Sequence, residues 1–251
     1  MYSQVNRTGY YSTHNLMTYI NVGNEKGVES LLKSGASANH HGYSVTALMF
    51  ACLNGKFGCA QFLLEYGADV NVVSKVDGKT SLIRASAKGD LNCVNLLLTC
   101  NALVNAQDRF GNSALMLASL SGHIACVKRL LENNPDVNLQ NQWNGTALSY
   151  ALKNGHIEIA ILLLKHGARV TVEALKALAN VINLASCSHL RFHMYLSLQK
   201  TSQPLKPWCE YLRLHQYRPN QTLSTNPIAP DTMKPWQRWV KENQYRPKPG
   251  V

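Results

Sequence analysis

Four similar ten-residue stretches recur through the middle of the chain and decide its fold: TALMFACLNG (46–55), TSLIRASAKG (80–89), SALMLASLSG (113–122) and TALSYALKNG (146–155). Their first residues lie 34, 33 and 33 positions apart. A weaker copy, HNLMTYINVG, begins at His14, 32 residues before Thr46. Self-similarity at a fixed period of this length is typical of proteins built from stacked repeats.

Three further positions recur in step with these stretches. A glycine closes each stretch, a pair of leucines follows, and four residues after the first leucine comes Gly or Asn in every copy. That last position suits left-handed backbone after a helix, because Gly lacks a Cβ and Asn tolerates positive φ. The positions are Gly23, Gly55, Gly89, Gly122 and Gly155, then Leu31, Leu63, Leu97, Leu130 and Leu163, then Gly35, Gly67, Asn101, Asn134 and Gly167.

This pattern predicts two short antiparallel helices in each unit, followed by an extended turn. Thr or Ser at the start of the first helix can accept hydrogen bonds from its free backbone N–H groups. The glycine between the helices permits a tight reversal. Each helix pair has an apolar face that it cannot bury alone, so the units must stack.

The sequence resembles the ankyrin repeat family over residues 14–170. The period of about 33, the T-x-L-x-x-A slot, GADVN at 67–71 and DRFGNSAL at 108–115 carry the resemblance. It implies an all-α solenoid of about five helix-turn-helix repeats with β-hairpin-like fingers. The slot lacks the family's Pro and His, and we expect an array less stable than a consensus one. The replacements are Ala47, Ser81, Ala114 and Ala147 for Pro, and Met49, Ile83, Met116 and Ser149 for His.

The chain divides into four predicted regions. An N-terminal segment (1–13) precedes five repeats over 14–170, with boundaries at about 14–45, 46–79, 80–112, 113–145 and 146–170. Residues 171–198 have helical apolar spacing without the repeat's turn, which predicts a cap or a degenerate sixth repeat. Residues 199–251 form a tail that contains eight of the nine prolines.

The net charge limits the class of partner, and the pattern of cysteines limits the cellular compartment. The net charge is +11, and +6 of it lies in residues 199–251. An excess of this kind indicates an anionic partner. We expect neither a secretory signal nor a membrane span, and the seven cysteines follow no disulfide spacing. A reducing compartment follows as the expectation: the cytoplasm, where the protein is expected to be cytoskeletal, or alternatively the nucleus.

No catalytic, cofactor or metal site is expected. Cys59, Cys93 and Cys126 occupy the same slot of successive repeats, too far apart for one disulfide or one zinc ion, and the fourth occupant is apolar Ile159. These cysteines are interpreted as buried core residues. His189 and His193 lack a third ligand, and no Gly-rich phosphate loop or nucleophile motif is present. An enzyme is therefore not expected.

The resemblance implies protein recognition on a concave face made by the fingers and the first helices. Large exposed aromatics are enriched at interface hot spots. The alternative is that each aromatic folds down onto its neighbouring finger. The candidate residues are Tyr43, Phe110 and Trp143 at the fingertips, and Phe50, Arg84, Lys88, Leu117 and Tyr150 on the helices.

The tail carries one basic aromatic segment twice, LKPWCEYLRLHQYRP (205–219) and MKPWQRWVKENQYRP (233–247). Each copy predicts one or two helical turns started by proline, too short to fold alone. Two copies favour bivalent docking, either on an elongated partner or on the repeats themselves. The candidate residues are Lys206, Trp208, Tyr211, Tyr217, Arg218, Lys234, Trp236, Trp239, Tyr245 and Arg246.

Three functions remain open from the sequence. The first is a non-enzymatic scaffold or adaptor, with the tail on an extended acidic assembly such as a microtubule. The second is nucleic-acid or chromatin binding through the tail, where bases stack on aromatics. The third is a substrate receptor of a ligase complex.

Overall fold

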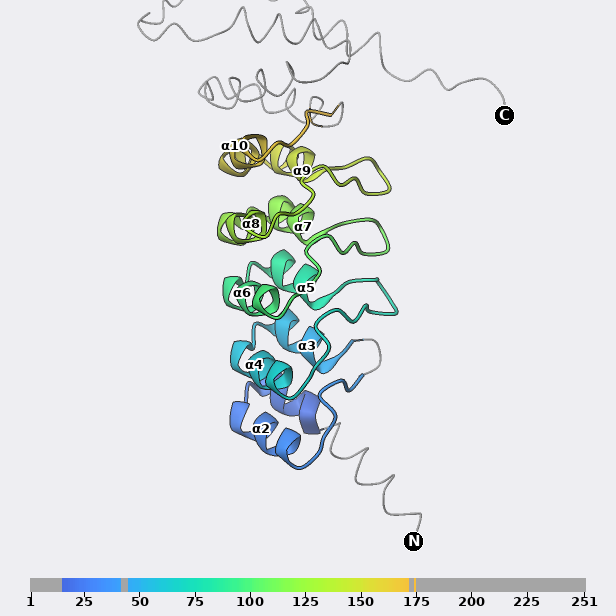
Figure 1. Cartoon of the computed structure of the whole chain (residues 1–251), viewed down its shortest axis with the longest axis vertical. Coiled ribbons are helices and arrows are strands. Elements are labelled where there is room, and N and C mark those ends of the chain that lie inside the picture. The colour runs from blue at the N-terminus through green and yellow to red at the C-terminus, as the bar shows by residue number, and fades with distance from the viewer. Residues whose placement is uncertain (1–14, 42–44, 172–173, 175–251) are drawn as a thin grey trace, which may run out of the picture.

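The computed structural model describes residues 15–41, 45–171 and 174, and these form a single column of stacked helix pairs (Figure 1). Residues 15–22 are helical and precede α2. The elements that follow are α2 (Glu25–Lys33), α3 (Ala47–Asn54), α4 (Phe57–Glu65), α5 (Ser81–Lys88), α6 (Leu91–Thr99), α7 (Ala114–Ser121), α8 (Ile124–Leu131), α9 (Ala147–Lys153) and α10 (Ile157–Lys165). The prediction of an all-α ankyrin-type solenoid is confirmed.

The helices stand in two rows. Helices α3, α5, α7 and α9 form an inner row, and α2, α4, α6, α8 and α10 form an outer row (Figure 1). Extended loops project beside the inner row, between α4 and α5, between α6 and α7, and between α8 and α9. We call them finger 2 (residues 74–79), finger 3 (107–113) and finger 4 (140–146). Residues 42–44, with Tyr43, lie outside the described residues.

Every described inner helix begins with the hydroxyl cap that the sequence predicts. Thr46, Thr80, Ser113 and Thr146 each accept a hydrogen bond from the backbone N–H three residues on, at 3.1 to 3.3 Å. All four cap residues are buried. The cap therefore satisfies a helix-end donor that water cannot reach.

The position between the two helices of a repeat requires glycine for two reasons: its backbone is left-handed, and there is no room for a Cβ. Gly89 has φ 80°, in the left-handed region. A Cβ there would lie 2.5 Å from the His123 ring of the next repeat. That ring lies 3.2 Å from the Ala87 carbonyl through Nε2, and His156 repeats the contact with Leu120. These two histidines thus join one repeat to the preceding one.

An asparagine ladder that the sequence reading missed also links the repeats. The amide oxygens of Asn39, Asn71, Asn105 and Asn138 accept backbone N–H groups of the following repeat at 2.7 to 2.8 Å. Three of these side chains also donate to a carbonyl of that repeat. The signal was present as asparagine recurring every 32 to 34 residues. The ladder ties together the loops that follow the outer helices.

The core is one continuous cluster that runs through all the described repeats. It includes Leu48, Ile83, Leu97 and Met116, each no more than 1% exposed, and Met49 is buried as well. Met49, Ile83 and Met116 fill the slot where the family places His. The described cysteines are free, and Cys52, Cys59, Cys93 and Cys126 are buried, as small core residues should be. Burial raises the pKa of the Cys126 thiol to about 11, so it stays protonated.

The predicted cap and tail fall almost wholly outside the described residues. Of the predicted cap, the structure describes only Thr171 and Ala174. The Ala174 N–H donates to Thr171 Oγ1 at 3.2 Å, and Ala174 is buried. This contact fits a helix start at Thr171. The boundaries of the four predicted regions stay predictions.

Candidate protein-binding face

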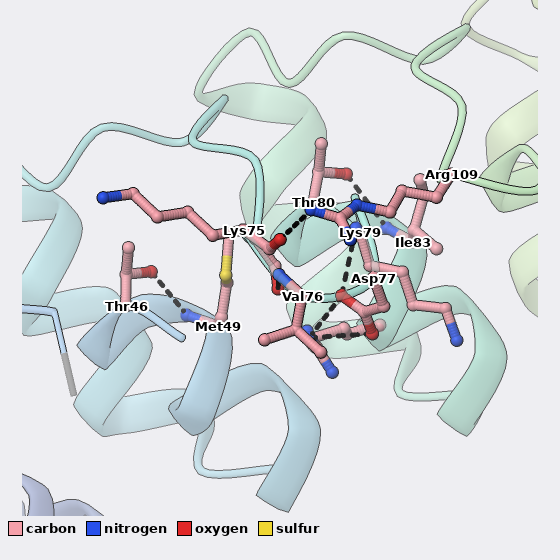
Figure 2. Close-up of polar contacts among 11 residues, drawn as sticks. Thr46, Met49, Lys75, Val76, Asp77, Lys79, Thr80, Ile83 and Arg109 are labelled. Carbon is pink, nitrogen blue, oxygen red and sulfur yellow. Dashed lines mark hydrogen bonds and ion pairs between the residues drawn. The ribbon is translucent and has the colours of Figure 1, made fainter. Parts of the chain in front are cut away.

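Fingers 2, 3 and 4 are hydrogen-bonded to one another in series. The Arg109 N–H donates to the Asp77 carbonyl at 3.0 Å, and the repeat-related Gln142 N–H donates to the Phe110 carbonyl at 3.0 Å. The Arg109 guanidinium also donates to the Lys75 carbonyl, as Figure 2 shows. The Gln142 side chain donates to the Arg109 carbonyl at 2.7 Å. The fingers are therefore fixed at a set spacing, and so are the side chains that they carry.

The tips of fingers 3 and 4 carry an exposed aromatic pair. Phe110 and Trp143 stack with ring centroids 5.7 Å apart and an interplanar angle of 25°. Both stay open to solvent, at 48% and 60% exposed. Each aromatic does lean on its neighbouring finger, yet it keeps about half of its surface free. The pair is thus an apolar surface that is already ordered before a partner arrives.

A buried amide network holds finger 4 from below. Asn141 is 5% exposed, and its side-chain oxygen accepts the N–H groups of Trp143 and Gly145 at 3.0 and 2.8 Å. Its amide nitrogen lies 2.9 Å from Asn112 Oδ1 and 2.6 Å from the Tyr150 hydroxyl. The turn that presents Trp143 is therefore held by buried groups, independent of any partner.

Finger 3 uses a carboxylate in the same place. Asp108 is 6% exposed and accepts the N–H groups of Phe110 and Asn112 at 2.9 and 2.8 Å. The Asn112 amide lies 3.3 Å from its other oxygen. The negative charge of Asp108 is thus enclosed within its own finger rather than offered to a partner.

Finger 2 is held by an ion pair. Arg84, at the tip-facing position of α5, donates from one nitrogen to both oxygens of Asp77 at 3.0 and 3.1 Å. The two side chains are 11% and 27% exposed. Burial alone would raise the pKa of Asp77, but hydrogen bonds from Ser74 and the Lys79 N–H, with the charge of Arg84, hold it below its ordinary value. Arg84 was expected to face a partner; most of its surface is instead committed to the finger.

The other inner-helix candidates differ in how much surface they offer. Phe50 and Tyr150 are half-buried, and Lys88 is exposed with its amine donating to the Leu53 carbonyl at 3.0 Å. Leu53 itself is 44% exposed. Leu117 is only 9% exposed, because it belongs to the apolar core cluster, and it adds little to an outer surface. Fingers 2 to 4, together with the exposed side chains of α3, α5, α7 and α9, form a surface that we call the finger face.

Within the described ranges the structure offers no metal centre. No group of three His, Cys, Asp or Glu side chains there could hold a metal ion. Nor is any described helix long and apolar enough to cross a bilayer. The candidate tail residues, from Lys206 to Arg246, and His189 and His193 lie outside the described residues.

Comparison with known proteins agrees with this geometry. The family model described as ankyrin repeats (3 copies) matches residues 16–108 and 82–174. The chain is 40% identical over 74 residues to a protein fem-1 homolog A-like of Mus musculus, which is 30% of this chain and 11% of that protein. It is 38% identical over 94 residues to a B-cell lymphoma 3 protein homolog of Mus musculus, covering 35% and 20%.

A third similarity has the same extent. The chain is 39% identical over 72 residues to a probable E3 ubiquitin-protein ligase, XBOS33, of Oryza sativa subsp. japonica, covering 28% of this chain and 14% of that protein. The matches therefore span at most a fifth of the length of these three relatives.

Proposed function

The chain belongs to the ankyrin repeat family, and from that premise we propose that it is a non-enzymatic scaffold or adaptor whose finger face holds a protein partner. The observation that carries this proposal is the stacked pair of Phe110 and Trp143, about half exposed on fingers that buried polar groups hold in place. Aromatic side chains with exposed rings are the usual anchors of protein interfaces.

The fingers are held in place before a partner arrives, and this favours a binding role for their exposed aromatic residues. Ordering a surface on association costs free energy, and a surface that is already ordered avoids part of that cost. Asn141 and Asp108 hold the two turns through buried hydrogen bonds, and Arg109 and Gln142 link one finger to the next. Phe110 and Trp143 are therefore presented in one geometry.

The duplicated tail supplies the second half of the proposal. Its net charge of +6 and its two KPW…QYRP copies support bivalent docking on an extended acidic assembly, such as a cytoskeletal polymer. An adaptor of this kind joins the partner of the finger face to that assembly. Nucleic acid is the alternative ligand for the tail, and a steep loss of affinity with rising salt would identify it.

A substrate receptor in a ligase complex is the second candidate function. It is favoured by the relative named a probable E3 ubiquitin-protein ligase. In that role the finger face would hold the substrate. The two candidates share the finger face and differ in what the remainder of the chain recruits.

The test is affinity capture by the intact chain and by three variants, read by mass spectrometry. Phe110→Ala/Trp143→Ala should lose the partners of the finger face, whereas Leu103→Ala, which changes a 61% exposed residue after α6, should keep them. Trp208→Ala/Trp236→Ala should lose a different set, either an acidic assembly or ligase subunits. An unchanged set of partners in the finger variant, with its fold intact by circular dichroism, would contradict the proposal.

A further inference from the structure

We propose that the finger face takes an extended acidic peptide, with one large apolar side chain over Phe110 and Trp143 and carboxylates on Lys75 and Arg109. This inference rests on the proposed function and specifies the partner's chemistry. It also assigns the finger face to another molecule, because the basic tail of this chain has the wrong charge for it. The argument comes from the charges, the apolar surface and the spacing of the fingers.

The described residues of the finger face carry free positive charge and no free negative charge. Lys75, Lys88, Arg109 and Lys153 are exposed there, and Lys79 is partly so. The two acids of the fingers are already used: Asp77 pairs with Arg84, and Asp108 is buried in its own turn. The remaining described acids lie elsewhere, on the outer helices, at the start of α6 or in the loops that follow the outer helices; they are Glu25, Glu29, Glu65, Asp69, Asp90, Glu132, Asp136 and Glu158.

The cations stand where a carboxylate can reach them. In Figure 2 the Lys75 side chain extends away from the turn of finger 2, and Arg109 crosses to that finger from finger 3. Arg109 spends only part of its guanidinium on the Lys75 carbonyl. A guanidinium has five donors, so others remain for a carboxylate. Lys75 and Arg109 therefore place two exposed basic side chains on fingers 2 and 3, before the aromatic pair of fingers 3 and 4.

The apolar part of the surface calls for a side chain rather than a phosphate. Val76 is 59% exposed on finger 2 and Leu53 is 44% exposed at the end of α3. Together with Phe110 and Trp143 they give the finger face an apolar component on several repeats. Aliphatic surface offers a phosphodiester backbone no contact, whereas it packs well against Leu, Phe or Trp of a peptide.

The spacing of the fingers suggests the register of the peptide. Neighbouring repeats stack at the helix-packing distance of about 8–10 Å. An extended chain advances about 3.3 Å per residue, so about three residues separate one finger from the next. An apolar residue on the aromatic pair then places acidic residues roughly three to six positions away, above Arg109 and Lys75.

The tail does not meet these requirements. The copy at 205–219 holds three basic residues and one acid, and the copy at 233–247 holds four basic residues and one acid. Like charges facing each other oppose association. The tryptophans of the tail could lie on apolar surface, but their flanking Lys and Arg would face Lys75 and Arg109.

The experiment is a selection of random twelve-residue displayed peptides on the intact chain. Peptides retained by wild type and lost with Trp143→Ala should be enriched in Asp and Glu about three to six positions from Trp, Phe or Leu. For such a peptide, Lys75→Glu/Arg109→Glu should weaken binding at least tenfold. Lys26→Glu, an exposed lysine in the first turn of α2, is the matched control and should change it less than twofold.

The outcomes separate this inference from the proposed function. Trp143-dependent peptides that are basic or neutral overturn the acidic partner and leave the protein-binding function standing. Absence of any Trp143-dependent peptide, with the fold intact by circular dichroism, overturns both. Displacement of a selected peptide by synthetic 205–219 assigns the face to the tail and overturns the inference. Displacement of a selected peptide by oligouridylate assigns the face to nucleic acid and also overturns the inference.

Discussion

Finger 2 and finger 4 have the same place in the repeat but are held by different chemistry. In finger 2 the tip residue, Asp77, turns inward to the guanidinium of Arg84. In finger 4 the tip residue, Trp143, points outward, and the turn is held beneath it by Asn141 and Tyr150. Arg84 and Tyr150 occupy the same position of their inner helices, α5 and α9, two repeats apart. The residue at this one position of the inner helix therefore differs between the finger whose tip residue is held inward and the finger whose tip residue is exposed.

The two fingers also differ in whether the tip residue holds the finger in place or stays available to a partner. A charged tip is used up by its own ion pair, so finger 2 offers its neighbours Lys75 and Val76 rather than Asp77. A neutral amide support leaves the tip of finger 4 available. The fingers therefore differ in what they present while their backbones remain hydrogen-bonded in one series.

Asn141→Ala is expected to have the largest effect on this comparison. It removes the acceptor of the Trp143 and Gly145 N–H groups and the partner of Asn112, leaving buried polar groups unpaired. The free energy of unfolding should fall by about 3 kcal/mol, measured by urea denaturation. Gln142→Ala, at the exposed next residue, should cost less than about 1 kcal/mol. Equal effects from the two changes would show that the amide network does not hold the finger.

Asp77→Asn should have an intermediate effect, because it leaves the mostly buried Arg84 without its charged partner. We expect a loss of about 2 kcal/mol at pH 7, and Asp77→Asn/Arg84→Met should recover part of it. The pKa of Asp77 is lower in the folded protein than its ordinary 3.8, so the pair stabilises fully above that pH and fades as pH falls through the folded value. The difference between wild type and Asp77→Asn should therefore shrink below about pH 4. A difference constant from pH 7 to pH 3 would contradict the ion pair.

The aromatic stack should have the smallest effect on stability. A double-mutant cycle of Phe110→Ala and Trp143→Ala should give a coupling of about 0.5–1 kcal/mol, because an exposed pair gains little from burial. Each single change should nevertheless weaken binding to a selected peptide more than it weakens the fold. A coupling near zero would mean that the rings merely touch. A loss of stability larger than that of Asn141→Ala would make the pair a structural element rather than a binding surface.

Much of the fold could be read from the sequence because the repeat imposes it locally. Capping by Thr46, Thr80, Ser113 and Thr146 and left-handed backbone at Asn101 and Asn134 are properties of short segments. Period and residue type were enough for both. The asparagine ladder was equally periodic, but its meaning depends on contacts about thirty residues away, and no local rule points to them.

The candidate face was predicted less completely, for the same reason. Phe110 and Trp143 were identified, and the structure shows part of each alternative: the two rings stack across neighbouring fingers, and each stays about half exposed. Leu117 and Arg84 were added as candidates because both lie at the same variable position of their inner helices. Alignment cannot tell that Leu117 is buried in the core or that Arg84 meets Asp77 seven residues before it, since both outcomes depend on how the side chains pack in the folded chain.

The sequence by itself determined the helix pairs, their caps, their turns and the ankyrin-type stacking, because each follows from residues within one period. Only the tertiary structure decided which finger residues face outward, that their two acids are enclosed, and that Lys75 and Arg109 stay exposed without a described acid paired to them. The physical reason is that exposure and free charge are set by side-chain contacts, some within a finger and its inner helix and some between repeats. Those contacts exist only once the chain has folded.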